Sequence, residues 1–461
     1  MMKKILLSVI FGLSAFSAFA GGVENKSNMS TGYLRNPSRN AECERPEAAF
    51  YNIAGTAFLN EGLYIEAGNQ FIFKEYGNEL KTFNMLSSKG LNDYYSNDET
   101  TVYFYPDADV VFKKGRWSIF MNFGVYAGGG ALTYSEGTSA TSLMFLKGAG
   151  DLKTEAEKYA YAAGAASSQG ETALAASYNS QYQLYGKAAK ASLEMAKHHS
   201  LDVTSITFGG QLGASFLVTD WLSLSAAFRY VTGTQDMTLK CNDLTFMFIN
   251  GGNSISYKAQ GFGESCVFGI HVKPPVIKNL DLSIQYQTLS RISYDVSDVK
   301  GLVASFYGIT NDSTFRTDLP AVLNLGAGYK LFDKLYLSGS YNYYFNNFAS
   351  QDSILSETNY DNSWEIAFGA DYRICKYIGI SAGFEYGNQG ITSSSNSTFN
   401  PVLDSFVLGG GIEIYPNEKL TITAAGMWCK YFDADYALSG IPTELSKKIT
   451  MCSIGVTYKP F

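Results

Sequence analysis

The sequence predicts an all-β protein: a 14-stranded antiparallel transmembrane β-barrel with an N-terminal hatch (plug) inside it and a helical insertion in an external loop. Composition is the first observation behind this prediction. The chain has 33 Tyr, 31 Phe and 45 Gly but only 10 Pro among 461 residues, which suits twisted strands that face an apolar medium. Charged residues make up 17%, below the ~25% that is usual in soluble domains. The other two observations are the number of alternating runs and the lengths of their connections.

Amphipathic runs with a period of two residues recur fourteen times along the chain. They lie at residues 62–76, 101–112, 116–133, 201–218, 221–239, 254–273, 279–294, 314–331, 334–348, 362–374, 376–388, 402–415, 419–432 and 447–461. Most are far longer than the strands of soluble sandwiches, which usually have about 5 or 6 residues. A soluble sandwich would also present a polar outward face, so a membrane barrel is the better interpretation.

The connections between these runs alternate in length. Six are tight turns with the sequences KKGR, TDW, PPVIKN, FDK, CK and PNEK, and the seven between them are long. Both ends of the barrel segment therefore fall on the short-turn side, as in bacterial outer-membrane barrels with their short periplasmic turns. The chain closes on Phe461, a terminal aromatic typical of outer-membrane strands, and Pro460 is expected to bend the last residues.

The two faces of each run differ in polarity. In the run 221–239, one face carries Leu222, Leu224, Ala226, Phe228 and Tyr230, and the other carries Ser223, Ser225, Ala227 and Arg229. Charged residues of other runs fall on the polar set of their own strands, namely Glu66, Asp107, Asp109, Lys330, Glu385 and Glu413. A charge on the lipid face at mid-membrane costs about 2 to 4 kcal/mol. The sorting predicts lipid outside the barrel and a polar lumen inside it.

The N-terminus predicts export. Residues 1–20 begin with Lys3 and Lys4, continue as an apolar run and close on an A-x-A site, so we expect a signal peptide cleaved after Ala20. Residues 21–60 then form the hatch, and residues 61–461 form the barrel. A net charge of -7 argues against nucleic acid as a partner. Six cysteines in so long a chain do not make a disulfide scaffold, and Cys429 and Cys452 fall on opposite faces of their strands.

Residues 21–60 contain almost no strand pattern and cannot pair into the wall. Their last part is nevertheless apolar, with Phe50, Tyr51, Ile53, Phe58 and Leu59. Apolar side chains that join no sheet must be buried elsewhere. The nearest cavity is the lumen, so this segment is expected to plug the barrel.

Three consecutive glycines, Gly128, Gly129 and Gly130, interrupt the third strand. Glycine inside a strand marks a bulge, a sharp bend or a close backbone approach. One interpretation is a gap in the wall where ladder pairing fails, and the other is a kink near the external rim with no function.

Residues 151–199 are rich in alanine and charge, which favours helix. Gly164 and Gly170 divide this segment into two helices in a long external connection. An apolar stripe at helical spacing runs along it through Tyr178, Tyr182, Tyr185, Ala189 and Ala196. The stripe fits either a cap packed over other loops or an apolar landing surface for a ligand.

These residues resemble a known family, the FadL/TodX hydrophobic-compound transporters, also called outer membrane protein transport proteins (OMPP1). The segment AAFYNIAGTAFL is similar to the family's A-x-x-Y-N-P-A-G-x-A hatch motif, with matches at Tyr51, Asn52, Ala54, Gly55 and Ala57. Ile53 replaces the usual proline, whose ring would fix φ. A second similarity is DLPAVLNLGAGYKLFDKLYLSGSYNYYF at residues 318–345, which resembles the family's L-P-x-x-x-x-L-G-x-x-Y hairpin.

The resemblance implies passive transport of hydrophobic compounds, with long-chain fatty acids as the expected ligand. The ligand would be captured externally, enter the lumen and leave sideways through the third-strand kink at Gly128 to Gly130 when the hatch shifts. Hatch residues carried over are Phe50, Tyr51, Asn52, Ile53 and Gly55. Arg229, Lys330 and Arg373 have lumen parity and would meet a ligand carboxylate, or would instead pair with Glu365, Asp371 or Glu385.

The same resemblance implies a monomer in the outer membrane of a Gram-negative bacterium. It would contact outer-membrane lipid along its whole wall, and the barrel assembly machinery through its C-terminal strand. No cofactor and no metal ion are expected.

Three other function classes are known for outer-membrane barrels. An outer-membrane enzyme would need a histidine, and the chain has only His198, His199 and His271, with no serine or aspartate placed near them by spacing, so no catalytic residue is predicted. A general porin for small hydrophilic solutes could share the same wall, but it would not need an apolar plug. TonB-dependent receptors have 22-stranded barrels and need far more chain.

Overall fold

The computed structural model describes residues 28–461 apart from residues 82–85, 99, 302–303, 305–308, 351, 353–359, 391–395, 397, 399–400 and 439–440. The predicted signal peptide at residues 1–20 lies outside the described residues. Within the described part of the chain, no helix combines the length and the apolar character that a membrane crossing requires.

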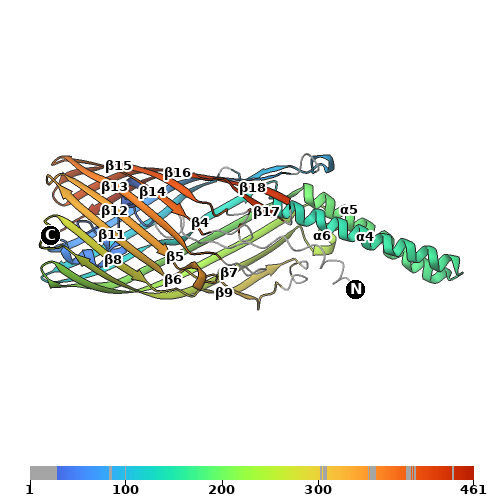
Figure 1. Ribbon diagram of the computed structural model, residues 1–461. Helices are drawn as coiled ribbons and strands as arrows, with labels where there is room; N and C mark the ends of the chain where they lie inside the picture. Colours follow the sequence, from blue (N-terminus) through green and yellow to red (C-terminus); the bar gives the residue numbers. More distant parts are fainter. Residues whose placement is uncertain are drawn as a thin grey trace.

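The fold is a closed antiparallel barrel with fourteen strands in its wall, which confirms the predicted fold class (Figure 1). β1 (Gly62–Leu80) pairs with β18 (Ile441–Tyr458), from Ile65 opposite Tyr458 to Leu80 opposite Thr443, and this pairing closes the sheet. Between them the wall runs through β3 (Thr100–Lys114), β4 (Trp117–Tyr134), β5 (His199–Thr219), β6 (Leu222–Cys241), β7 (Ser254–Val272), β8 (Leu280–Gln287) with β9 (Ser293–Lys300), β10 (Thr314–Arg316) with β11 (Val322–Leu331), β12 (Leu335–Tyr344), β13 (Ser363–Cys375), β14 (Ile378–Asn388), β15 (Ser405–Asn417) and β16 (Leu420–Tyr431).

Two wall strands predicted as continuous are each broken in two. The predicted runs 279–294 and 314–331 correspond to β8 with β9 and to β10 with β11. Pro320 lies in the second break, and its missing N–H cannot join a ladder. At the same level a single bridge, Ser290 to Leu319, connects the two broken strands. β2 (Tyr94–Ser96) and β17 (Ala434–Leu438) are short additions beside β1 and β18.

The long connections carry the external helices. α4 (Ser139–Ser168) and α5 (Thr172–Lys197) form a hairpin that projects from one end of the barrel, away from the end with the C-terminus (Figure 1). The helical insertion begins at Ser139 and not at the predicted residue 151, because Thr138 caps it by accepting a hydrogen bond from the Thr141 N–H. Shorter helical turns in these connections are η2 (Ser87–Lys89), α6 (Leu244–Asn250) and η3 (Asn346–Phe348).

The apolar stripe on the second helix is used partly inside the hairpin. Gly164 lies within α4, and the single break between the helices is at Gly170, with φ of 77°. The rings of Tyr159 and Tyr185 stack with centroids 5.2 Å apart and join the two helices. Tyr185 is therefore a packing residue of the hairpin.

The two faces of the wall separate as the alternation predicts. On β6 the Phe228 side chain is 50% exposed on the outside, whereas the neighbouring Arg229 is 2% exposed inside. Cys429 is buried and Cys452 is exposed, so these two residues lie on opposite faces.

The N-terminal segment, defined here as residues 28–59, lies inside the barrel and is buried along nearly its whole length. It contains α2 (Thr31–Arg35), α3 (Ala48–Tyr51) and the 3-10 helix η1 (Ile53–Phe58). α2 lies against β15 and β16, and η1 lies against β5, β6 and β7. The segment thus spans the lumen from one side of the wall to the other.

Candidate transport pathway

The predicted hatch residues hold the N-terminal segment to itself and to the wall. The Tyr51 hydroxyl accepts a hydrogen bond from the Met29 N–H at 2.9 Å, which joins the two ends of the segment. The Asn52 side-chain amide donates to the Glu42 carbonyl at 2.9 Å and contacts His271 Nδ1 at 2.7 Å. These contacts are built around the local turn in which Asn52 caps η1.

Two positions of the hatch motif have specific backbone requirements. At Gly55 a Cβ atom would lie 2.3 Å from the Glu42 carbonyl oxygen, so only glycine fits without a shift of the backbone. The Ile53 N–H donates a hydrogen bond to Gln285 Oε1 at 3.0 Å. A proline has no N–H to donate, so isoleucine adds an attachment to the wall that the family's usual residue could not make.

A buried ion-pair network fixes the other side of the segment. Arg45 pairs with Glu413 of β15 at 2.6 Å, and Arg39 pairs with Asp371 of β13 at 3.4 Å. Arg35 also pairs with Asp371 and lies 3.5 Å from Glu413. Removal of one partner from a buried pair typically costs about 3 to 5 kcal/mol, because it leaves an uncompensated charge. Sequence reasoning missed these arginines, because their partners lie hundreds of positions away in the chain.

Arg229, one of the three predicted carboxylate contacts, is buried on the lumen face of β6. Its guanidinium donates to the Gln211 side-chain oxygen at 2.7 and 3.0 Å and to that of Gln287. It also stacks on two rings, 5.2 Å from the Phe50 centroid and 4.6 Å from the Tyr126 centroid. Among the described residues, no carboxylate lies within 4.0 Å of it. Arg229 is therefore a buried cation held by amides and aromatic rings, beside a cavity of about 30 Å³.

The other two predicted contacts lie elsewhere. Lys330 pairs with Glu44 at 3.1 Å, and Arg373 donates to the carbonyls of Cys375 and Lys376 at 3.1 and 3.0 Å. Both line a separate pocket of about 270 Å³ at the end with the tight turns. The structure does not bring them together with Arg229.

The triple glycine lies at a defect in the wall. Gly128 and Gly130 of β4 have φ of 90° and 79°, and the register against β5 shifts between Val125 and Gly130. On the other side, the pairing of β4 with β3 ends at Gly124 opposite Asp107. Higher up, the Asp98 N–H donates to the Thr133 carbonyl at 2.8 Å and joins the two sides again. Between these two points the described residues of β3 and β4 form no ladder with each other, although each strand still pairs with its other neighbour, and we call this interval the wall window.

Lys74 of β1 reaches the kink from inside. Its ammonium group donates to the Gly129 carbonyl and, at 3.3 Å, to the Ala131 carbonyl. The bend turns these backbone oxygens away from the ladder, and the buried lysine satisfies them. The kink is therefore a formed local structure with its own hydrogen bonds.

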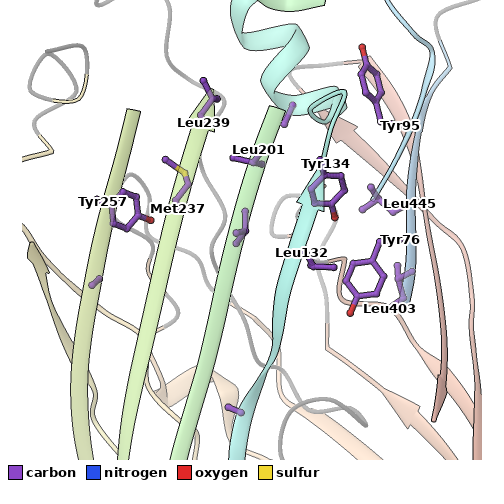
Figure 2. Close-up of a cluster of buried hydrophobic side chains, with 14 of the residues drawn as sticks. Tyr76, Tyr95, Leu132, Tyr134, Leu201, Met237, Leu239, Tyr257, Leu403 and Leu445 are labelled. Carbon is purple, nitrogen blue, oxygen red and sulfur yellow. The ribbon is translucent and has the colours of Figure 1, made fainter. Parts of the chain in front are cut away.

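The upper lumen is apolar, contrary to the polar lumen predicted for the whole barrel. Figure 2 shows Tyr134, Leu201, Met237, Leu239 and Tyr257 on neighbouring strands of this buried cluster. All are buried. Exposed charges on the outer face at this level, such as Lys240 and Lys258, indicate that the barrel wall extends beyond the membrane there.

The signal for this reversal was present in the sequence. On β6 the inward residues are Ser223 and Arg229 low in the strand but Met237 and Leu239 near its outer end, while the outward residue Lys240 there is exposed. The prediction gave each face of the strand one polarity over its whole length and therefore missed this change.

A polar pocket of about 690 Å³ opens at the base of the helical hairpin. His199 lines it and is buried, with ring nitrogens 2.8 Å from the Met195 carbonyl and 2.5 Å from the Thr141 hydroxyl. His199 lies far outside the apolar band, because about 43 Å of strand separates it from the lipid-facing Leu212 at ~3.3 Å per residue. Burial lowers the pKa of His199 to about 4.

This shift predicts an acid-sensitive junction. A histidine held neutral in the folded state contributes stability above its unfolded pKa of about 6.5, and this stability is lost as pH falls toward 4. We expect the junction between α4, α5 and β5 to become protease-sensitive between about pH 6 and pH 4. Limited proteolysis at stepped pH measures this. A His199→Gln variant should lose the pH dependence and the exposed-neighbour control His198→Gln should keep it; the same dependence in both variants would contradict the assignment.

Comparison with known proteins agrees with this architecture. The sequence profile of the family described as outer membrane protein transport protein (OMPP1/FadL/TodX) matches residues 137–436. No curated protein sequence matches the chain.

Solved structures with the same fold include a Pseudomonas aeruginosa FadL homologue, with 15% identity, a TM-score of 0.63 and coverage of 94% of this chain and 98% of that chain. The Ralstonia pickettii toluene transporter TbuX has 13% identity and a TM-score of 0.57, over 95% and 99% of the two chains. The Pseudomonas putida toluene transporter TodX has 11% identity and a TM-score of 0.58, over 96% and 100%. The profile match and the closed barrel place the protein in the outer membrane.

Proposed function

Because the chain belongs to the outer membrane protein transport protein (OMPP1/FadL/TodX) family, which is made of transport channels, we propose that it carries hydrophobic compounds passively across the outer membrane. The observation that carries this proposal is the change of polarity along the lumen. Apolar side chains line its outer half, and the wall window opens beside the N-terminal segment that fills its inner half.

The path follows from this arrangement. A hydrophobic ligand gains free energy by leaving water for the apolar upper lumen. The buried ion pairs and hydrogen bonds of the N-terminal segment close the way straight down. The ligand then leaves sideways through the wall window between β3 and β4 when this segment acts as a hatch and shifts. A porin for hydrophilic solutes would need an open polar lumen, and the segment fills that part of the barrel.

Arg229 supports a ligand with a carboxylate, and we propose long-chain fatty acids. Its charge has no acidic partner among the described residues within 4.0 Å, and it lies between the upper lumen and the N-terminal segment. The aromatic rings of Phe50 and Tyr126 beside it would pack against the alkyl chain. We propose further that the protein acts as a monomer embedded in outer-membrane lipid, and that its C-terminal strand is recognised by the barrel assembly machinery.

A pair of ligands that differ only in charge tests this assignment. Arg229→Gln should weaken binding of palmitate by about 10- to 100-fold, since a hydrogen bond to a charged group contributes roughly 1.5 to 3 kcal/mol. Binding of methyl palmitate should stay within a factor of about two. Tryptophan or tyrosine fluorescence titration of the detergent-solubilised protein measures both.

Arg373→Gln is the matched control, because Arg373 is a cation of the same kind in the separate lower pocket. It should leave both affinities unchanged. An equal loss of both ligands in Arg229→Gln would show that the arginine shapes the lumen without contacting a carboxylate. Absence of palmitate binding by the wild-type protein would contradict the proposed ligand class.

A further inference from the structure

Three carboxylates on the inner wall lie together without a counter-charge. Glu66 of β1 is directly opposite Asp109 of β3, and Asp107 lies two positions away on the same face. Their ligand oxygens all lie within 4.8 Å of one another, and all three side chains are buried. Like charges directly opposite in a sheet are destabilising. The grouping therefore needs a compensating positive charge.

The basic residues of the N-terminal segment form their ion pairs with other acids. Arg35, Arg39 and Arg45 are paired with Glu42 and Glu47 of the N-terminal segment itself, with Asp371 of β13 and with Glu413 of β15. No ion pair between described residues includes Glu66, Asp107 or Asp109. Charge is thus unevenly distributed in the lumen. Asp371 of β13 and Glu413 of β15 have arginine partners, whereas the three clustered acids of β1 and β3 have no ion-pair partner among the described residues.

Several oxygens at this cluster also lack hydrogen-bond partners. Glu66 accepts from the Thr457 hydroxyl at 2.7 Å, and one oxygen of Asp109 accepts from the Asn122 amide at 2.9 Å. Both oxygens of Asp107 and the second oxygen of Asp109 have no hydrogen-bond partner, although Asp107 is only 3% exposed. A buried carboxylate without partners is costly unless it is paired or coordinates a metal ion.

An independent oxygen from the N-terminal segment points to the same place. The hydroxyl of Thr31, the first residue of α2, is buried at 2% exposure and likewise lacks a hydrogen-bond partner. Both this hydroxyl and the Asp107 carboxylate approach Gly68: a Cβ atom there would lie 2.8 Å from the Thr31 oxygen and 2.6 Å from Asp107 Oδ1. Glycine at position 68 leaves room for the two groups to approach each other.

We propose that Glu66, Asp107, Asp109 and Thr31 form a calcium site that ties the N-terminal segment to the wall. The donor set contains oxygen alone, which selects a hard cation. Calcium binds oxygens at about 2.3 to 2.6 Å in flexible geometry, so two ligands on one shell lie up to ~5 Å apart, as these do. Magnesium demands near-ideal octahedral geometry at about 2.0 to 2.1 Å. Asp107 is opposite Gly124, where β3–β4 pairing ends, so the ion would sit at the lower edge of the wall window.

Calcium titration of the purified full-length protein tests the site. After dialysis against a chelator, calorimetry with CaCl2 should show about one calcium bound per chain, and the thermal unfolding midpoint should rise with calcium until the site is saturated. A tenfold excess of MgCl2 should not reproduce this rise. Asp107→Asn should abolish both responses, and Thr31→Ala should weaken calcium binding by a few fold.

Glu385→Gln is the matched control, because Glu385 is another buried lumen carboxylate that lies beside a further acid and accepts a hydrogen bond from Tyr33 at 2.8 Å. It should bind calcium like the wild type. In chelator, Asp107→Asn should unfold at the same temperature as the wild type or higher, because it removes a repelling charge. No calcium uptake by the wild type, or equal uptake by the wild type and Asp107→Asn, would overturn the proposal and indicate that the acids are neutralised by protons or that calcium binds elsewhere.

Discussion

Valine at Gly128 is expected to remove most uptake of a hydrophobic probe while the barrel still folds. The residue has φ of 90°, which a β-branched residue almost never adopts. A Cβ atom there would lie 2.4 Å from the Ser205 carbonyl oxygen and 2.8 Å from Ile206 Cα, both on the backbone of β5. Strain of this kind costs about 1 to 3 kcal/mol. The strand can relieve it by straightening, which would bring β4 back alongside β3 and close the wall window.

The adjacent glycine provides the control for this experiment. Gly129 has no positive φ, and the nearest atom to a Cβ there is the end of the flexible Lys74 side chain at 3.3 Å. Gly129→Ala should therefore transport normally. Folding is checked by the heat-dependent gel mobility of both variants, and transport by accumulation of a fluorescent fatty acid in cells. Normal uptake by a folded Gly128→Val protein would place the exit somewhere other than the wall window.

The barrel could be predicted from the sequence because the membrane imposes a strict pattern on it. Side chains must alternate between apolar and polar along each strand, because one face of the wall meets lipid and the other meets the lumen. Each connection must also lead back into the next strand from the same side of the membrane. The number and order of the strands therefore follow from the local sequence pattern. The breaks between β8 and β9 and between β10 and β11 depend on pairing between neighbours at Ser290 and Leu319. Local alternation carries little information about such a break, although Pro320 marks its position.

The transport pathway could be predicted only in part. The interruption of the third strand at Gly128 to Gly130 is visible in the sequence, but the wall window depends on where β3 stops pairing with β4, and no single strand contains that information. Alternation places Arg229 in the lumen, whereas the amide partners that hold it there, Gln211 of β5 and Gln287 of β8, follow only from the folded barrel. Alternation places Glu66, Asp107 and Asp109 in the lumen, but their convergence requires the register that sets Glu66 against Asp109.

Deletion of residues 21–46 is expected to convert a closed barrel into a leaking one. The described part of this stretch fills the lumen and carries Arg35, Arg39 and Arg45, which hold the rest of the N-terminal segment against the wall. Barrels of about 8 strands are filled by their own side chains, whereas those of 16 to 18 leave an aqueous channel. A 14-stranded barrel that lacks these lumen-filling residues should therefore conduct ions at a porin-like level in planar bilayers. The intact chain should show almost no conductance.

The remaining residues 47–59 keep contacts with one side of the wall, such as the Ile53 N–H to Gln285 Oε1, but they should not reseal the lumen, because they lose the contacts that connect them with the rest of the N-terminal segment. Tyr51 would lose the Met29 N–H, Asn52 would lose the Glu42 carbonyl, and Glu47 would lose its arginines. A matched control shortens the external hairpin by replacing residues 161–177 with a Gly-Ser turn, which preserves the Tyr159–Tyr185 stacking and should leave conductance unchanged. If the deletion conducted no more than this control, the lumen would have to be closed by the wall or its external loops, and movement of the N-terminal segment would not be needed to open the path.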